Sequence, residues 1–212
     1  MDGKGVIEVL RTMCRRMEDE KDFLTQLDNE IADGDHGINM ARGFAAVEKK
    51  LPELAEKDLG TVLKTVGMTL VSVIGGSAGP LYGTMFLRSG LALAGRTELS
   101  VDDFLACLKV SVEGVQQRGR AVRGEKTMLD AMIPALEAMT AARAAGGDAG
   151  TVLAAGLSAA RAGVEYTKTI AATKGRASYI GARSLGHQDP GATSFASLLE
   201  CVEKCQRNDT SD

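Results

Sequence analysis

The chain has 212 residues, of which 44% are hydrophobic and 25% charged, and its formal net charge is −3. It can therefore bury a full core, and it offers no basic stripe to nucleic acid or to an anionic membrane. Aromatic residues make up only 4% of the chain, so the apolar weight falls on Ala, Leu, Val and Met, which favour helices over strands.

Apolar residues recur with helical spacing along the chain, and no long alternating strand pattern occurs. Glycine, proline and N-capping residues mark the breaks between the periodic segments. We therefore predict helices at residues 4–31, 38–51, 59–74, 80–95, 101–118, 126–145, 148–171 and 192–206. Because the loops are mostly short, sequential helices should be antiparallel, which predicts one all-α domain over residues 1–212.

The residues that carry chemistry concentrate in alternate loops of this predicted helical array. These loops follow the first, third, fifth and seventh helices, at residues 33–37, 75–80, 119–126 and 173–191. Alternate loops of an up-and-down bundle lie at the same end, so the sequence predicts one functional end. The last loop is about twenty residues long, a length that usually indicates binding to a ligand or closing over it.

Three aspartates in the first of these segments predict a metal site. Asp28 precedes Asp35 by about two helical turns, and Asp33 and Asp35 flank Gly34. A helix that ends near Ile31 would bring the three carboxylates together, where a hard cation such as Mg²⁺ would offset their repulsion. The alternative is an ordinary loop at a helix C-terminus with solvated acids.

The other loops at this end carry features that suit an anion. Residues 75–80 are rich in glycine and precede a helix, as in an anion site, although they also fit plain turn chemistry. Arg176 in the long loop can bind phosphate through two hydrogen bonds. The only two histidines, His36 and His187, lie in loops at the same end. Together with the aspartates, these features predict a nucleotide bridged by Mg²⁺ and phosphoryl transfer.

Several familiar site classes do not fit the sequence. Residues 119–127 nearly spell a phosphate-binding P-loop, but Glu125 interrupts the required Gly-Lys step. The Asp33-Gly34-Asp35 segment begins like a calcium-binding EF-hand, but Ile38 occupies the place of its required glycine. The loops offer too few His and Cys residues for a zinc site, and no serine elbow is present.

Four separated segments resemble the nucleotide-binding L subunits of bacterial dihydroxyacetone kinases, in order and at fitting distances. They are residues 27–44, 58–87, 124–130 and 174–193. The resemblance implies a single barrel of eight antiparallel helices with ADP or ATP at one end. It also implies that two Mg²⁺ ions are held by Asp28, Asp33 and Asp35. The nucleotide contacts that it implies are His36, Gly37, Ile38, Asn39, Ser77, Ala78, Gly119, Met128, Arg176, Asp189, Pro190 and Gly191.

Two mechanistic types of this family are known, and they imply different partners. In one, the domain is fused to a substrate-binding domain and uses ATP as a substrate. In the other, a separate subunit keeps ADP bound, receives phosphate from a phosphohistidine protein of the phosphotransferase system, and passes it to dihydroxyacetone on a K subunit. Because this chain contains only the nucleotide domain, we expect the second type, with the ADP becoming ATP transiently.

Other functions and partners stay open at this point. The chain also fits an ATP-dependent kinase subunit for dihydroxyacetone or a related ketose or tetrose. A third alternative is a regulator that binds a transcription factor according to its nucleotide state, and a homodimer is open. No signal region follows residues 1–4, apolar runs such as 66–74 are too short to span a bilayer, and the four cysteines form no CxxC pair. We therefore expect a cytoplasmic protein without a membrane segment.

Overall fold

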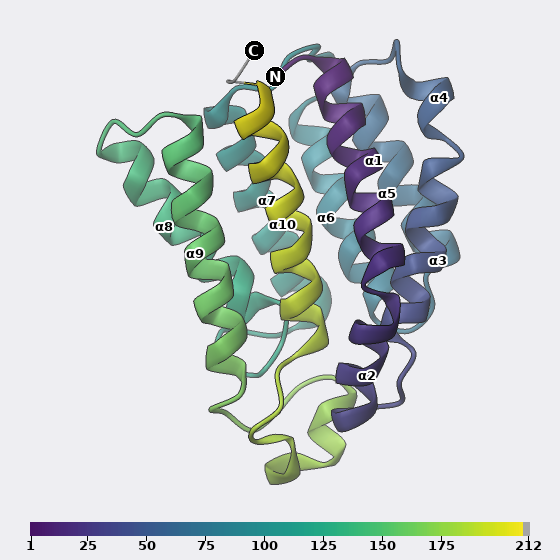
Figure 1. Cartoon of the computed structure of the whole chain (residues 1–212), viewed down its shortest axis with the longest axis vertical. Coiled ribbons are helices and arrows are strands. Elements are labelled where there is room, and N and C mark those ends of the chain that lie inside the picture. The colour runs from purple at the N-terminus through teal and green to yellow at the C-terminus, as the bar shows by residue number, and fades with distance from the viewer. Residues whose placement is uncertain (210–212) are drawn as a thin grey trace.

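Eight long helices form a closed ring in the computed structural model, which describes residues 1–209 (Figure 1). They are α1 (Gly3–Asp19), α3 (His36–Glu48), α5 (Leu59–Val73), α6 (Ala78–Ala92), α7 (Val101–Gly119), α8 (Leu129–Ala144), α9 (Ala149–Thr167) and α10 (Pro190–Asp209). Each of these helices contacts the next one along the chain, and α10 contacts α1. One cluster of buried apolar side chains runs through all eight.

Four shorter elements complete the described part of the chain. They are α2 (Lys21–Ile31), α4 (Leu51–Leu54) and the 3₁₀ turns η1 (Arg176–Tyr179) and η2 (Gly181–Ser184). Residues 1–209 contain no strand, only an isolated bridge between Asp2 and Glu98. No helix within the same residues is long and apolar enough to cross a membrane. The predicted all-α class is thus confirmed.

Some of the predicted helix boundaries are wrong. The predicted helix at 4–31 is two helices, because the backbone turns at Glu20, where neither glycine nor proline marks a break. The predicted helix at 126–145 starts only at Leu129, because the Asp130 carboxylate accepts hydrogen bonds from the Gly124 and Thr127 amides and holds the preceding residues in a turn. The predicted helix at 148–171 already ends at Thr167.

The remaining differences shift the ends of helices by a few residues. Helix α3 begins at His36 and ends at Glu48, and the separate short helix α4 follows it where one helix at 38–51 was expected. Helix α10 extends the predicted segment 192–206 at both ends. The expected loop at 173–191 contains the two 3₁₀ turns.

Helices α5 and α6 pack closely because glycines face each other along their contact. A Cβ atom on Gly67 would lie 2.8 Å from the Leu87 amide nitrogen and 2.9 Å from the Gly83 carbonyl oxygen. Two turns away the contact repeats, since a Cβ on Gly60 would lie 2.8 Å from the Gly90 carbonyl oxygen. The glycines therefore set the distance between these two helices.

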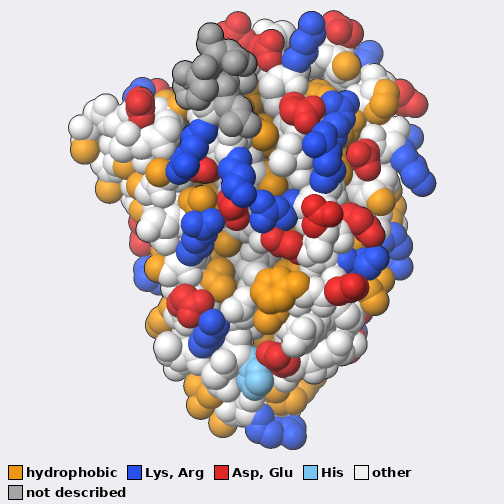
Figure 2. All heavy atoms as spheres, in the orientation of Figure 1, with side chains coloured by type: hydrophobic (Ala, Val, Ile, Leu, Met, Phe, Trp, Pro, Cys, Tyr) orange, Lys and Arg blue, Asp and Glu red, His pale blue; other side chains and the backbone are white. Residues whose placement is uncertain are grey.

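An ion cluster joins the helices on either side of the point where the ring closes. The Glu200 carboxylate of α10 lies 3.5 Å from Arg16 of α1, 3.3 Å from Arg161 of α9 and 2.7 Å from Lys204 of α10. Figure 2 shows acidic and basic side chains interleaved over this face of the molecule. The cluster adds an electrostatic contact between the first and last long helices.

The two ends of the ring differ in character. The start of α1 and the end of α10 lie at one end (Figure 1), where the interior holds an apolar cavity of about 330 Å³ lined by side chains that include Leu10, Phe86, Phe104 and Phe195. The opposite end carries α2, the two 3₁₀ turns and a second cavity of about 460 Å³, whose walls include charged side chains. Of these two cavities, the second has the polar walls that a charged ligand needs.

The close packing of α5 and α6 predicts the effect of Gly67→Ala. Alanine favours a helix over glycine by about 1 kcal/mol, but its methyl group would press on backbone atoms of α6. We expect the overpacking to win and to lower the free energy of unfolding by about 1–2 kcal/mol. Urea denaturation measures this, with the exposed Gly150→Ala as the control. A Gly67→Ala variant as stable as the wild type would contradict the packing argument.

Candidate functional site

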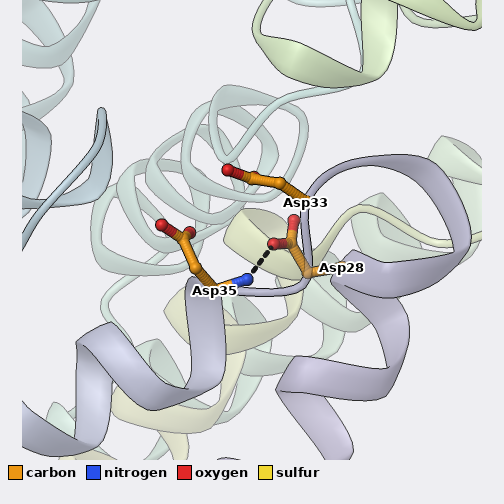
Figure 3. Close-up of side chains that lie close together, drawn as sticks. All are labelled: Asp28, Asp33 and Asp35. Carbon is orange, nitrogen blue, oxygen red and sulfur yellow. Dashed lines mark hydrogen bonds between the residues drawn. The ribbon is translucent and has the colours of Figure 1, made fainter.

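The three predicted aspartates meet at the junction of α2 and α3 (Figure 3). Asp28 lies in the last turn of α2, and Asp33 and Asp35 lie in the loop that follows. One oxygen of each carboxylate lies within 4.8 Å of the other two. The predicted convergence of the carboxylates is therefore confirmed.

Asp28 fixes this loop with one of its oxygens. Its Oδ2 atom accepts hydrogen bonds from the backbone amides of Asp35 at 2.9 Å and His36 at 3.2 Å, and so caps the start of α3. Burial raises the pKa of Asp28, the two amide hydrogen bonds lower it, and the charges of Asp33 and Asp35 raise it further. The Asp28 carboxylate is thus held in place by two amides, while burial and the neighbouring carboxylates disfavour its ionised form.

Gly34 allows the loop to turn between Asp33 and Asp35. Its φ is +72°, a left-handed conformation that other residues rarely adopt. A Cβ atom at this position would also lie 1.9 Å from Oδ1 of Asn29. The turn therefore requires glycine, and it places both flanking carboxylates beside Asp28.

The donor set fits a hard divalent cation. It consists of three carboxylates without cysteine or histidine, which is the oxygen-only set that Mg²⁺ prefers. Within the part of the chain that the structure describes, these aspartates form the one group of three or more His, Cys, Asp or Glu side chains close enough to hold a metal ion.

Four loops that are distant in sequence wall the polar cavity beside these carboxylates. Most of the predicted site residues line it: Asp28, Asp33, Asp35, His36, Ser77, Ala78, Gly119, Met128, Arg176, Asp189, Pro190 and Gly191. Its volume of about 460 Å³ is typical of a small-molecule site. The predicted functional end is thus where alternate loops come together.

Three of the predicted contacts do not line this cavity. Gly37 packs against α2, where a Cβ atom would lie 2.0 Å from the Lys21 carbonyl oxygen. Ile38 is 51% exposed, and the Asn39 side chain accepts a hydrogen bond from Arg42. The second histidine, His187, also lies outside the lining and pairs with Glu30 at 2.8 Å.

Three long helices begin at the cavity wall. His36, Ala78 and Pro190 are the first residues of α3, α6 and α10, and all three line the cavity. Ser77, the N-cap residue of α6, makes no capping hydrogen bond with its side chain. Helix N-termini carry a partial positive charge and amide groups that bind anions. Asp28 and Asp189 already accept hydrogen bonds from amides at the starts of α3 and α10. Of these three helices, α6 is therefore the one whose first amides can meet an anion beside the carboxylates.

His36 belongs to a hydrogen-bonded network that the sequence does not reveal. Its Nε2 atom lies 2.9 Å from Ser194 Oγ, which in turn lies 2.7 Å from the hydroxyl of buried Tyr82. Desolvation lowers the pKa of His36 to about 4, so the ring is neutral at pH 7. Because Ser194 is 158 residues away along the chain, no local pattern signals this pair.

Charged groups face one another across the cavity mouth. The Arg176 guanidinium of η1 lies 2.9 Å from Asp33 Oδ2.

Two buried charged residues also line the cavity. Asp189 at the start of α10 is buried, and its Oδ2 accepts a hydrogen bond from the Ala192 amide at 2.7 Å. Burial, the largest effect, raises the pKa of Asp189 to about 7. The buried Lys126 also lines the cavity, and sequence reasoning assigned it no role.

Comparison with known proteins shows what this chain is similar to. The model of the DAK2 domain family matches residues 30–204. The ADP-binding subunit DhaL of the PEP-dependent dihydroxyacetone kinase of Escherichia coli is 44% identical over 183 residues, which cover 86% of this chain and 87% of that protein. The ADP-binding subunit DhaL of the PTS-dependent dihydroxyacetone kinase of Lactococcus lactis is 38% identical, with 92% and 94% of the two chains covered.

A solved structure is similar along nearly the whole chain. It is the dihydroxyacetone kinase of C. freundii in complex with AMP-PNP and Mg²⁺, with a TM-score of 0.70 and 26% identity. The match covers 94% of this chain and 33% of that longer chain. The present chain therefore corresponds to about a third of that kinase.

The repulsion among the aspartates predicts opposite effects of Asp35→Asn with and without metal. In the presence of a chelator, the variant should be more stable than the wild type by roughly 0.5–1 kcal/mol, because one of three mutually repelling negative charges is removed. With Mg²⁺ it should lose most of the stabilisation that metal binding gives the wild type. Thermal unfolding in EDTA and in Mg²⁺ measures both effects. An equal rise in melting temperature with Mg²⁺ in both proteins would contradict the metal assignment.

The buried Asp189 predicts a pH-dependent stability. Its folded-state pKa of about 7 lies above the ordinary value of 3.8, so the carboxylate destabilises the fold increasingly as pH rises between these values. Asp189→Asn keeps the hydrogen-bond acceptor and removes the charge. We expect the variant to be more stable than the wild type at pH 8, with the difference vanishing near pH 4. A difference that does not change with pH would contradict this assignment.

Proposed function

Because the chain belongs to the DAK2 domain family, we propose that it is the ADP-binding subunit of a dihydroxyacetone kinase that takes its phosphate from a phosphoprotein. The observation that carries the proposal is that three carboxylates line one polar cavity together with the first residues of three helices. The similarity to known proteins also supports the proposal. Over most of its length the chain resembles subunits that are named as ADP-binding and that belong to kinases named as PEP- or PTS-dependent.

Each residue of the site would have its own role toward the proposed ligands. Bound ADP would take a phosphoryl group from a phosphohistidine donor and pass it to a hydroxyl of dihydroxyacetone on a separate K subunit, while Mg²⁺ offsets the negative charge. Asp28, Asp33 and Asp35 would hold two Mg²⁺ ions. Asp28 holds its place because its other oxygen caps α3. Arg176 exchanges Asp33 for phosphate, which a guanidinium binds through two hydrogen bonds.

The lining of the cavity supports transfer without a covalent intermediate on this chain. Among the described residues no cysteine lines the cavity, and the one histidine that does, His36, has its Nε2 atom engaged in a hydrogen bond with Ser194. The residues therefore bind and orient the reacting groups, and the acceptor hydroxyl comes from the partner. This agrees with the exposure of Asp33 and Arg176 in the cavity wall, which would give a second protein access.

The proposal extends to the contacts that the cavity lining leaves out. Gly37, Ile38 and Asn39 follow the capped start of α3, and their contact with the nucleotide stays a prediction of the resemblance. A cytoplasmic location, a homodimer and a transcriptional regulator as a further partner stay predictions of the sequence.

The decisive experiment distinguishes the source of phosphate. The purified chain is mixed with Mg²⁺, a trace of ADP, dihydroxyacetone and a K subunit, together with either a phosphohistidine donor or free ATP, and dihydroxyacetone phosphate is measured. We expect turnover with the phosphoprotein and little with ATP. Equal turnover with ATP would identify an ATP-dependent kinase subunit instead. No product with either donor, from a chain that retains ADP, would favour a regulatory binding protein.

A charge variant tests the metal ligands in the same assay. Asp33→Asn should lose nucleotide retention and abolish transfer while the fold survives, because one carboxylate is missing from the metal site. Asp22→Asn is the matched control, since Asp22 is an exposed aspartate of α2 that does not line the cavity. Normal transfer by Asp33→Asn would defeat the metal assignment.

A further inference from the structure

Lys126 is a lysine in an unusual place. Only 1% of it is exposed, although lysine is almost never fully buried without partners. Its ammonium group donates hydrogen bonds to three backbone carbonyl oxygens, those of Thr167 at 2.6 Å, Ile170 at 3.3 Å and His187 at 2.5 Å. An ammonium group has three donors, so all of them are satisfied.

The three carbonyl groups lie at the two ends of one segment of the chain, residues 168–189, which connects α9 to α10. Thr167 is the last residue of α9, Ile170 lies just after it, and His187 lies just before α10. The middle of this segment supplies Lys174, Gly175 and Arg176 to the cavity wall. One ammonium group therefore ties both ends of a segment whose middle borders the cavity.

Other hydrogen bonds close the same segment on itself and on the loop that carries Lys126. The Gly186 amide donates to the Lys168 carbonyl oxygen at 2.8 Å, and the Asp189 amide donates to Thr167 Oγ1 at 2.9 Å. The Thr173 amide donates to the Glu125 carbonyl oxygen at 3.3 Å, directly beside Lys126 in sequence. Backbone hydrogen bonds therefore hold the two ends of the segment together.

The backbone at Lys126 indicates that its side chain is needed there. Its φ is +60°, a left-handed conformation that costs free energy for any residue except glycine. Burial of the ammonium group lowers its pKa, while the nearby carboxylates of Asp189 and Asp130 raise it. A glycine would relieve the backbone cost, but it would leave three carbonyl groups without their donor.

We infer that Lys126 is a positioning residue that clamps segment 168–189 beside the nucleotide cavity and so sets how long the nucleotide stays bound. The clamp holds Arg176 where it faces Asp33 across the mouth of the cavity. The part of the inference that concerns the nucleotide rests on the proposed function. The part that concerns the segment rests on the hydrogen bonds alone.

Lys126→Met tests the clamp, because methionine fills a similar space without donors. Amide hydrogen exchange of the nucleotide-free protein should become at least about tenfold faster within 168–189, and stay unchanged in α5 and α6. Dissociation of ADP in Mg²⁺ buffer should also become at least about tenfold faster. The matched control is Lys168→Met, because Lys168 belongs to the same segment but pairs at the surface with Glu165. This control should behave as the wild type in both measurements.

Each outcome decides one part of the inference. Unchanged exchange in 168–189 would overturn the clamp, and so would an equal rise of exchange throughout the chain. Faster exchange with unchanged ADP dissociation would overturn the link to the nucleotide. If Lys126→Met does not fold, Lys126→Arg takes its place, since a planar guanidinium cannot direct its donors at three converging carbonyl groups. A wild-type chain that binds no ADP would refute the proposed function, while the exchange measurement would still test the clamp.

Discussion

Mutual repulsion of three carboxylates is the constraint around which the functional end of this protein is arranged. Asp28, Asp33 and Asp35 lie within 4.8 Å of one another, and this arrangement is stable only with compensating groups. Two backbone amides at the start of α3 satisfy Asp28, and the Arg176 guanidinium pairs with Asp33. A bound divalent cation would supply the rest of the compensation, and this is the physical basis of the proposed metal site.

The ring of helices makes this arrangement possible by holding distant loops at one end. Close packing of α5 against α6 and the ion cluster around Glu200 join neighbouring helices without involving the cavity. The loops therefore carry the chemistry, while the helices fix their positions. Segment 168–189 is the longest connection at this end, and Lys126 ties it to the loop before α8.

Local sequence patterns are enough to predict much of this fold and site. The aspartates lie within eight residues of the chain, so their convergence follows from the spacing of Asp28 and Asp35 and from the glycine between Asp33 and Asp35. Helical periodicity likewise locates the eight long helices. The break at Glu20 escapes prediction because no glycine or proline marks it.

The missing parts of the site depend on contacts between residues far apart in sequence. The Lys126 ammonium reaches carbonyl groups 41 to 61 residues away, and His36 meets Ser194 across 158 residues. In sequence, Lys126 is only the lysine of an interrupted P-loop pattern. The raised pKa of Asp189 also depends on burial, which follows from the packing of α10 rather than from its neighbours in the chain.

The central claim is that one cavity holds a nucleotide through metal ions bound to the three aspartates. Native mass spectrometry of the chain, saturated with ADP and Mg²⁺ and then dialysed extensively in Mg²⁺ buffer, tests it most directly. The account predicts the mass of one ADP and two Mg²⁺ ions on each chain, with both lost together after EDTA treatment. A chain that keeps its bare mass in excess ADP and Mg²⁺, or that keeps ADP after the metal is removed, would contradict it.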